Sequence, residues 1–324
     1  MQLILFGTGP FAVPSYASLI EKHDVLALVT RPIQDSGKRR KTAANPTRDL
    51  AVEKGIPVFD PPSCNDDEFV ATLREFSADL FVVCDYGQIL SSPCLASARL
   101  GGINLHGSLL PKYRGAAPIQ WCVFNGDTET GVTVIHMTPK LDGGPCIVKQ
   151  ALAIGDDETS EQLEPRLSQL GVSAVAEAIE MLEAWDGESV LGEVQEKSQV
   201  TKAPRLKKSD GLIDFSRSAK QIFDQVRAFQ PWPGSFMHWT PPGKNPLRLI
   251  VQKVSVVSAA AQAEVECAEV APSRVAFSNK TALWIRTGDG LISIDEIQPA
   301  GKRSMPITEF LRGYQPQAGD ELKG

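Results

Sequence analysis

The sequence predicts an α/β protein with a Rossmann-like, doubly wound, mostly parallel sheet in its first part and a small β-barrel in its last part. In the first part, short apolar runs of β-prone residues alternate with segments of helical periodicity, which is the pattern of β-α-β units. In the last third, short β-prone runs follow one another with turn residues between them, which is typical of a small barrel. The length of 324 residues also suggests about two domains.

Six strands and four helices are expected to alternate in the first part. The strands are expected at residues 3–6, 25–29, 80–84, 103–106, 132–137 and 147–153. The helices are expected at residues 13–21, 47–54, 67–76 and 117–125. A further helix follows the capping-box pattern Thr159-x-x-Gln162 and has apolar residues at helical spacing as far as Leu182. Pro165 leaves the start of this helix open.

The segment 197–208 shows neither the periodicity of a helix nor that of a strand. It contains five basic residues and no acidic one, and we interpret it as an extended linker. After it, a short helix is expected at residues 219–227. The barrel strands are expected at residues 248–257, 265–271, 282–287 and 291–297.

The composition is that of an ordinary globular protein, with 42% hydrophobic and 22% charged residues. No apolar run approaches the roughly 18–20 residues of a membrane span, and the N-terminus lacks the basic start of a signal peptide. The six cysteines form no Cys-x-x-Cys pair and have no histidine at metal-ligand spacing. We therefore expect a cytoplasmic protein without membrane attachment, structural disulfides or a metal.

The net charge of −6 is unevenly distributed. Residues 1–194 have 15 basic and 26 acidic residues (−11), whereas residues 195–324 have 18 and 13 (+5). A basic second part can follow a phosphate backbone. Chance variation of the surface would explain the same numbers, so charge alone leaves both interpretations open.

Asn104 and His106 are the strongest candidates for chemistry. They lie two residues apart at the end of an expected strand, so their side chains project from the same face. Open α/β sheets place their sites at this carboxyl end of the strands. Asp142 adds a carboxylate within Leu-Asp-Gly-Gly, a sequence that would also suit an ordinary turn. The amide, imidazole and carboxylate suit acyl transfer, and no serine or cysteine beside a base suggests a covalent intermediate.

The segment NLHGSLLPKYRG at residues 104–115, with LDGG at residues 141–144, carries a specific signature. It resembles the Asn-x-His-x-Ser-Leu-Leu-Pro and later Leu-Asp-x-Gly of the folate-dependent formyltransferase family. The resemblance is closest to the members that act on methionyl-tRNA. It extends to FGTGPFAVPSYASL near the start and to KKSDGLIDFSRSAKQI and VRAFQPWPGSF later, and weakens after about Pro241.

The resemblance implies transfer of the formyl group of 10-formyltetrahydrofolate to the α-amino group of initiator methionyl-tRNA, for translation initiation and without a metal. Asn104 and a protonated His106 would donate to the tetrahedral oxyanion, and one such donor typically contributes about 3–4 kcal/mol. Asp142 would orient His106 and carry the proton towards the departing folate nitrogen.

The resemblance also implies a folate pocket. It assigns the pterin to the loop of Ser108, Leu109, Leu110 and Pro111, where a bend with apolar side chains and backbone groups suits a flat ring with a polar edge. A hydrophobic plug is the alternative for that loop. A second loop would contribute Tyr86 and Gln88. The chain departs from the family pattern there and near Asp142, with the unusual residues Asp85, Ser91, Gly143 and Pro145.

A basic insertion with Arg39, Arg40 and Lys41 stands where the family members acting on tRNA have an acceptor-stem loop. Such a run is more often a solvated face, and only the resemblance assigns it to phosphates. Secondary candidates lie in the linker: Arg205, Lys207 and Lys208. The expected domains are a catalytic domain at 1–190, a basic linker at 191–208 and a tRNA-binding, open, oligonucleotide-binding-like barrel at 209–324.

Several alternatives accompany this interpretation. The run Gly7-Thr8-Gly9-Pro10-Phe11-Ala12 fits a dinucleotide-binding turn, but no acid follows the second strand to hold a ribose, so we favour a tight strand-to-helix turn. A formyltransferase for a nucleotide-linked amino sugar shares the expected catalytic residues. A formyltransferase for glycinamide ribonucleotide should end near the first domain. A non-catalytic RNA-binding module would not need Asn104, His106 and Asp142.

Overall fold

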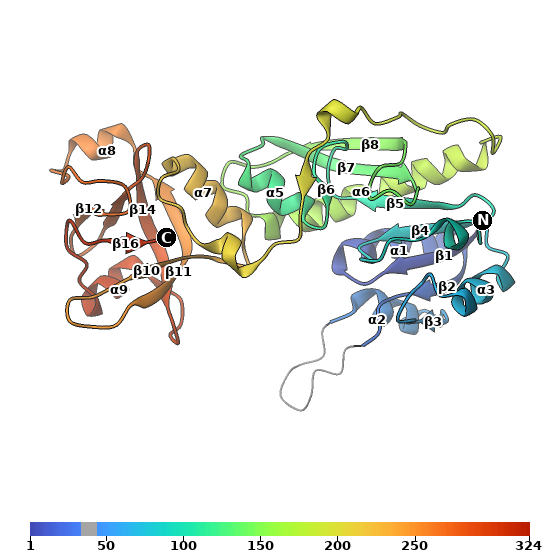
Figure 1. Ribbon diagram of the computed structural model, residues 1–324, viewed down its shortest axis with the longest axis horizontal. Coiled ribbons are helices and arrows are strands. Elements are labelled where there is room, and N and C mark those ends of the chain that lie inside the picture. The colour runs from blue at the N-terminus through green and yellow to red at the C-terminus, as the bar shows by residue number, and fades with distance from the viewer. Residues whose placement is uncertain (34–43) are drawn as a thin grey trace. The chain divides into compact units, whose positions relative to one another are not determined.

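A computed structural model describes residues 1–33 and 44–324 of the chain. The chain divides into two compact units, each drawn as a ribbon in Figure 1. Unit 1 consists of Met1–Pro118, Glu129–Ala153 and Leu163–Pro204. Unit 2 consists of Ile119–Thr128, Ile154–Gln162 and Arg205–Gly324.

Unit 1 is built on a seven-stranded sheet with the order β3-β2-β1-β4-β5-β7-β8. Its strands are β1 (Gln2–Gly7), β2 (Asp24–Val29), β3 (Val58–Phe59), β4 (Leu80–Cys84), β5 (Gly102–His106), β7 (Glu129–His136) and β8 (Cys146–Ala153). The first five of these pair with one another in parallel, whereas β7 runs antiparallel to β5 and to β8. The connection from His136 to Cys146 is too short for the crossover of about a dozen residues that a parallel pair needs. The Rossmann-like, mostly parallel sheet expected from the sequence is confirmed.

Helices cover both faces of this sheet. They are α1 (Val13–Lys22), α2 (Pro46–Glu53), α3 (Asp67–Glu75), α4 (Ser92–Leu95) and most of α6 (Ser160–Glu183). On α1, the buried Tyr16 hydroxyl donates to the carbonyls of Phe6 and Val82 at 2.6 and 3.1 Å, which attaches this helix to β1 and β4. On the opposite face, α3 and α4 pack their apolar side chains over Phe6 and Phe81.

The start of α6 follows the expected capping pattern. The Thr159 amide donates to Oε1 of Gln162, and the Gln162 amide donates to the Thr159 hydroxyl. The helix then continues through Pro165. Further along, the Ser168 hydroxyl donates to the Phe11 carbonyl at 2.8 Å. This bond joins α6 to the short 3-10 helix η1 (Pro10–Ala12) after β1.

The glycine-rich turn after β1 allows two close approaches of the backbone. A Cβ atom added at Gly7 would lie 2.9 Å from the Cys84 carbonyl oxygen. A Cβ atom at Gly9 would lie 1.7 Å from Oδ2 of Asp85. The backbone contact explains Gly7, as a tight strand-to-helix turn requires, whereas at Gly9 the atom in the way is the end of an exposed side chain that can move.

Unit 2 contains a curled, antiparallel half-barrel. Its sheet has the order β12-β13-β14-β11-β10-β16, with β15 paired to β14. The strands are β10 (Ser235–Trp239), β11 (Leu247–Val256), β12 (Val275–Ser278), β13 (Leu283–Arg286), β14 (Leu291–Pro299), β15 (Met305–Pro306) and β16 (Leu322–Lys323). The helices are α5 (Pro118–Phe124) from its second residue on, α7 (Ala219–Ala228), α8 (Ala259–Ala263) and α9 (Ile307–Gly313). The apolar side chains of α7 and α9 fill the inside of the sheet, so the expected open barrel is confirmed.

One expected strand is wrong. Residues 265–271 form no strand; the strand of this region is β12, further along the chain. The β-prone run that suggested a strand includes Cys267 and Val270, which pack against a small cluster around Ala276 and Leu291. One backbone hydrogen bond, from the Ala268 amide to the Ala276 carbonyl, accompanies that packing. Strand β10, between proline- and glycine-rich turns, was not expected.

The segment interpreted as an extended linker has local structure. It contains the 3-10 turn η2 (Lys197–Gln199) and the short strand β9 (Lys202–Ala203), and a second 3-10 turn, η3 (Lys208–Gly211), begins at its last residue. Strand β9 pairs in parallel with β6 (Arg114–Gly115) of unit 1. The first half of the expected linker is thus part of the unit that holds the candidate site.

Three further properties concern membranes, metals and cysteines. Among residues 1–33 and 44–324, no helix is both long and apolar enough to cross a membrane. The same residues contain no group of three His, Cys, Asp or Glu side chains suited to a metal ion. All six cysteines are free thiols, and five of them are buried.

Candidate functional site

Strand β5 presents Asn104 and His106 at its carboxyl end. The strand lies between β4 and β7, with Asn104 opposite Val83 and His106 opposite Thr133. Its register therefore places both side chains on one face of the sheet, as the two-residue spacing predicts. His106 is 6% exposed, whereas Asn104 is half-buried.

The ring of His106 is oriented by a backbone group. Its Nε2 atom lies 2.9 Å from the carbonyl oxygen of Tyr113. Because a carbonyl can only accept, Nε2 carries the hydrogen and donates. The other nitrogen, Nδ1, is consequently the atom that can gain or lose a proton during a reaction.

Asp142 lies in the connection between β7 and β8, close to that second nitrogen. Its Oδ2 atom lies 3.8 Å from His106 Nδ1, and its side chain is 11% exposed. The same oxygen accepts a hydrogen bond from the Gly115 amide at 2.9 Å. The backbone of Asp142 has a φ of 46°, a left-handed conformation that Asp and Asn adopt more readily than most residues. The three residues expected to be catalytic therefore all lie in unit 1, with His106 beside Asp142.

Asn104 completes the polar face of β5. Among the described residues its side-chain amide makes no hydrogen bond to the protein, although the Asn104 backbone is paired within the sheet. Its NH₂ group is therefore available to a carbonyl or oxyanion of a substrate.

The loop after β5 has side chains that hold its own shape. The Ser108 hydroxyl donates to the Lys112 carbonyl at 2.7 Å. Thr133 on β7 accepts from the Leu110 amide at 3.0 Å and donates to the Ser108 carbonyl at 2.7 Å. Ser108, Leu110 and Pro111 are buried, while Leu109 is partly exposed. Of the four residues expected to bind the pterin, Leu109 alone has a side chain with an appreciable exposed surface.

The second expected pterin loop follows β4. The Tyr86 ring is buried with its edge towards Phe6, at 5.4 Å between centroids, so this side chain belongs to the core. The Gln88 amide donates to the Pro62 carbonyl and accepts from the Cys64 amide. Both side chains therefore shape the loop, and the loop backbone is the part that remains for a ligand.

Arg31 fastens the same loop from the end of β2. Its guanidinium donates to the carbonyls of Tyr86 and Gly87 at 2.8 and 2.7 Å. Burial and the nearby Cys64 thiol raise the pKa of Tyr86 above its usual range, so its phenol stays neutral. Asp85, the residue that departs from the family pattern, is exposed and has a φ of 50°.

The basic residues expected to contact tRNA fall into two groups. Arg39, Arg40 and Lys41 lie outside the described residues. Arg205, Lys207 and Lys208 are exposed at the start of the long final segment of unit 2.

Two residues of the site were missed from the sequence. Tyr113 acts through its carbonyl oxygen, which no side-chain pattern indicates. Gln195 donates to the backbone carbonyls of Asp142 and Gly144 at 2.8 and 2.7 Å, from a segment expected to be linker. The sequence offers no signal at Gln195 beyond its place in the expected linker of residues 191–208.

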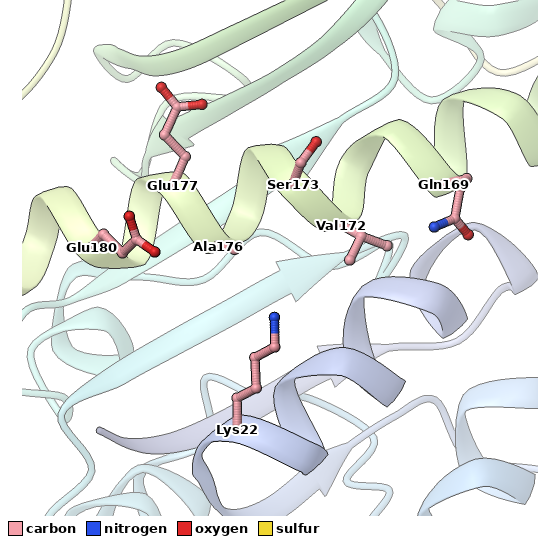
Figure 2. A pocket seen from close by; sticks show the side chains of 7 residues that line it. All are labelled: Lys22, Gln169, Val172, Ser173, Ala176, Glu177 and Glu180. Atoms are coloured by element: carbon pink, nitrogen blue, oxygen red, sulfur yellow. The ribbon is translucent and has the colours of Figure 1, made fainter.

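A shallow hollow of about 500 Å³ lies elsewhere on unit 1. Figure 2 shows that it runs along α6 with Lys22 of α1 on the opposite side. It is lined by Lys22, Gln169, Val172, Ser173, Ala176, Glu177 and Glu180. None of these is a candidate site residue, so the hollow is separate from the polar end of β5.

The chain matches two family descriptions. Residues 1–179 match "Formyl transferase", and residues 205–315 match "Formyl transferase, C-terminal domain". Among solved structures, an N-formyltransferase from Helicobacter canadensis, in complex with folinic acid and dTDP-3-aminofucose, has a TM-score of 0.62. It is 18% identical and covers 90% of this chain and 98% of that one, so the likeness shows the fold alone.

Curated relatives are much more similar in sequence. The methionyl-tRNA formyltransferase of Rhodopirellula baltica is 46% identical over 99% of this chain and 96% of its own length. That of Desulfotalea psychrophila is 40% identical over 100% of this chain and 96% of its own length. With both domain descriptions matched and identity of this level along the whole sequence, the chain belongs to the methionyl-tRNA formyltransferase family of formyl transferases.

Proposed function

We propose that the chain transfers the formyl group of 10-formyltetrahydrofolate to the α-amino group of initiator methionyl-tRNA, giving N-formylmethionyl-tRNA. One observation carries the chemical part of this proposal. The carboxylate of Asp142 lies 3.8 Å from Nδ1 of a histidine whose other nitrogen is held by a carbonyl. A proton-exchanging imidazole beside a carboxylate, with an amide donor on the same strand, is suited to a tetrahedral intermediate.

The reaction begins when the neutral amine attacks the formyl carbon. The pKa of an aminoacyl ester amine lies near or below the roughly 8 of free termini, so a useful fraction is neutral near pH 7. A C–N bond forms and the carbonyl π electrons move to oxygen. The Asn104 NH₂ group and Nδ1–H of protonated His106 then stabilise the oxyanion by donating hydrogen bonds to it.

Collapse of the intermediate reforms the carbonyl and breaks the bond from the formyl carbon to the folate nitrogen. The amine loses one proton and the folate nitrogen gains one, so the products are the formamide and tetrahydrofolate. His106 and Asp142 pass that proton from the amine to the folate nitrogen. Every bond between heavy atoms that forms or breaks belongs to the two substrates, and the protein only relays the proton.

The backbone of two loops would hold the folate. The Ser108–Pro111 loop is fixed by Thr133, and the Tyr86–Gln88 loop by Arg31. Because these bonds fix both loops, the backbone donors and acceptors that they do not use are held in rigid positions for the polar edge of a pterin. Leu109 would contribute apolar contact.

Methionyl-tRNA is proposed as the acceptor because of the curated relatives. The amino-sugar formyltransferase from Helicobacter canadensis resembles the chain at only 18% identity, against 46% for the Rhodopirellula baltica enzyme. Arg39, Arg40 and Lys41 are proposed to contact the acceptor stem. Arg205, Lys207, Lys208 and the half-barrel of residues 209–324 are proposed to contact the rest of the tRNA through its phosphates.

A formyl transfer assay with three acceptors tests the proposal. Initiator methionyl-tRNA, elongator methionyl-tRNA and a dTDP-linked amino sugar are each incubated with the protein and 10-formyltetrahydrofolate. Formylation of initiator methionyl-tRNA should have the largest kcat/KM. Faster formylation of the amino sugar would contradict the acceptor, and failure with all three would contradict the chemistry.

A second assay tests the basic insertion. Replacing Arg39, Arg40 and Lys41 by Ala should weaken aminoacyl-tRNA binding and flatten the dependence of log kcat/KM on log salt. The slope should fall by roughly 0.9 for each duplex phosphate that these side chains neutralise. The KM for folate should stay unchanged. Equal activity and equal salt dependence would make this segment an ordinary solvated surface.

A further inference from the structure

Gln195 holds the backbone on both sides of Gly143. Its side-chain NH₂ group donates to the carbonyls of Asp142 and Gly144 at 2.8 and 2.7 Å. Its side-chain oxygen accepts from Nε and Nη2 of Arg114 at 3.1 and 2.7 Å. Gln195 is 8% exposed, so these bonds form away from competing water. Both hydrogens and both lone pairs of this amide are thus used on the loop and on Arg114.

The loop that Gln195 holds is the one that presents the Asp142 carboxylate. Asp142 has a left-handed backbone, and Gly144 packs closely against the end of β7. Together these two features fix the direction in which the Asp142 side chain projects. A Cβ atom at Gly144 would lie 1.8 Å from the His136 carbonyl oxygen. Because the carboxylate has only two side-chain torsions, its distance from His106 depends mainly on this backbone.

The same segment also holds the group that orients His106. The Thr201 hydroxyl accepts from the Tyr113 amide at 2.8 Å. Lys202 and Ala203 pair with Arg114 and Gly115 in the two-stranded sheet of β6 and β9. In residues 113–115, the Tyr113 carbonyl accepts a hydrogen bond from His106, and the Gly115 amide donates one to Asp142. Residues 195–203 therefore support both members of the His106–Asp142 pair through the backbone groups that hold them.

We propose that Gln195 is a positioning residue, which sets the Asp142 carboxylate against His106 through the two carbonyls it binds. This inference rests on the proposed formyl transfer. It goes beyond that function by assigning a catalytic contribution to a residue in the segment between the two matched family domains. Gln195 acts through the loop and touches neither substrate.

Gln195→Ala and Gln195→Glu separate positioning from simple anchoring of Arg114. Alanine removes every hydrogen bond of this side chain. Glutamate has the same size and keeps an acceptor for Arg114, but it has no NH₂ group to donate to the two carbonyls. Both variants should lower kcat by about 10- to 100-fold, the range that misplacement of a reacting group by about 1 Å produces. The KM values for 10-formyltetrahydrofolate and methionyl-tRNA should change less than about threefold.

Glu193→Gln is the matched control. Glu193 lies two residues away, and its exposed side chain pairs with Lys149. This variant should keep wild-type kcat, and melting temperatures of all variants should be compared under the assay conditions. If Gln195→Ala does not fold, Gln195→Glu decides, because it preserves the volume of the side chain and removes only the NH₂ group.

Three results would overturn the inference. They are a kcat for Gln195→Ala within about twofold of wild type, a change confined to KM, and near-normal kcat in Gln195→Glu beside a strongly reduced kcat in Gln195→Ala. The last result would make Gln195 an anchor for Arg114 only. Absence of formyl transfer by the wild-type chain would instead contradict the proposed function, so the two failures are distinguishable.

Discussion

The carbonyl oxygen of Tyr113 accepts the Nε2 hydrogen of His106 at 2.9 Å, which leaves Nδ1 directed towards Asp142. A backbone acceptor cannot exchange roles with its donor, so this contact selects one tautomer of the neutral ring. In the proposed mechanism, the proton that moves is therefore the one on Nδ1. The position of His106 therefore depends on the main chain after β5. A substitution of the Tyr113 side chain does not remove this hydrogen bond, because the acceptor is the backbone carbonyl.

Replacing His106 by Ala should lower kcat by about 100- to 1,000-fold, the usual effect of losing one donor to a developing oxyanion. The dissociation constant of 10-formyltetrahydrofolate, measured by titration, should stay within about threefold of wild type. His23→Gln serves as the control, because His23 lies at the end of α1 and contacts the N-terminal amine. Near-normal turnover of His106→Ala would contradict the assigned mechanism.

Asp142→Asn should separate the charge of this residue from its hydrogen bond. Asparagine tolerates the left-handed backbone and can still accept from the Gly115 amide. We expect kcat to fall by about 100-fold with little loss of stability, because the imidazolium loses its neighbouring charge. Asp142→Ala should also destabilise unit 1 by about 1–2 kcal/mol, since the Gly115 amide loses its acceptor. Equal kcat in wild type and Asp142→Asn would make Asp142 a structural turn residue.

The sequence was most informative where burial controls the pattern. Strands β1, β2, β4 and β5 were recognised because their apolar residues are buried within the sheet, and Asn104 and His106 followed from the two-residue period of a strand. The segment 265–271 shows the limit of that reasoning, because half-buried apolar residues in an irregular segment imitate a strand. Periodicity reports burial more directly than it reports hydrogen bonding.

The contacts that organise the candidate site were beyond sequence reasoning for a different reason. Gln195 is 53 residues from Asp142 in sequence, and it binds backbone carbonyls, which every residue has. The Tyr113 carbonyl likewise leaves no signal in the sequence. Candidate side chains can be found from spacing and resemblance, whereas the groups that orient them become visible only when the chain is folded.

Asp224 should be the most sensitive charged residue of unit 2. It is 3% exposed and accepts from Nε of Arg227 at 2.8 Å and from the Lys220 amine at 2.6 Å. Asp224→Ala leaves the buried Arg227 without its carboxylate and should cost about 3–5 kcal/mol. Glu309→Gln breaks an exposed pair with Arg303 and should cost less than about 1 kcal/mol. Urea denaturation followed by a unit 2 signal such as Trp239 fluorescence would measure both, and similar losses would contradict the burial argument.

Asp79 predicts a pH dependence of the stability of unit 1. The hydrogen bond from the Gln2 amide, followed by Arg99, lowers the pKa of the Asp79 carboxyl below its ordinary value. A lowered pKa in the folded state stabilises the protein above the unfolded-state value of about 3.9, and that contribution disappears as pH falls through the folded-state pKa. The free energy of unfolding of Asp79→Asn should therefore be lower than that of wild type by up to about 1 kcal/mol at pH 7. The two should be equal at a pH below the folded-state pKa of Asp79. Glu53→Gln serves as the control. A stability difference between Asp79→Asn and wild type that does not change with pH would contradict the assignment to the lowered pKa of Asp79.

The exposed cations Arg205, Lys207 and Lys208 provide a test of tRNA binding on residues that the structure describes. If all three meet phosphates, their replacement by Gln should reduce the slope of log Kd against log salt by up to about 2.7, which is three phosphates at roughly 0.9 each. The decrease in affinity should be largest at low salt, where counterion release contributes most. Folate binding should be unchanged, because Ser108 to Pro111 are untouched.

A triple replacement of Lys54, Arg74 and Arg99, which are also exposed, changes the net charge equally and controls for long-range attraction. Filter binding of methionyl-tRNA at several salt concentrations measures the slope, and equal slopes in the two triple variants would show that Arg205, Lys207 and Lys208 bind no phosphates specifically.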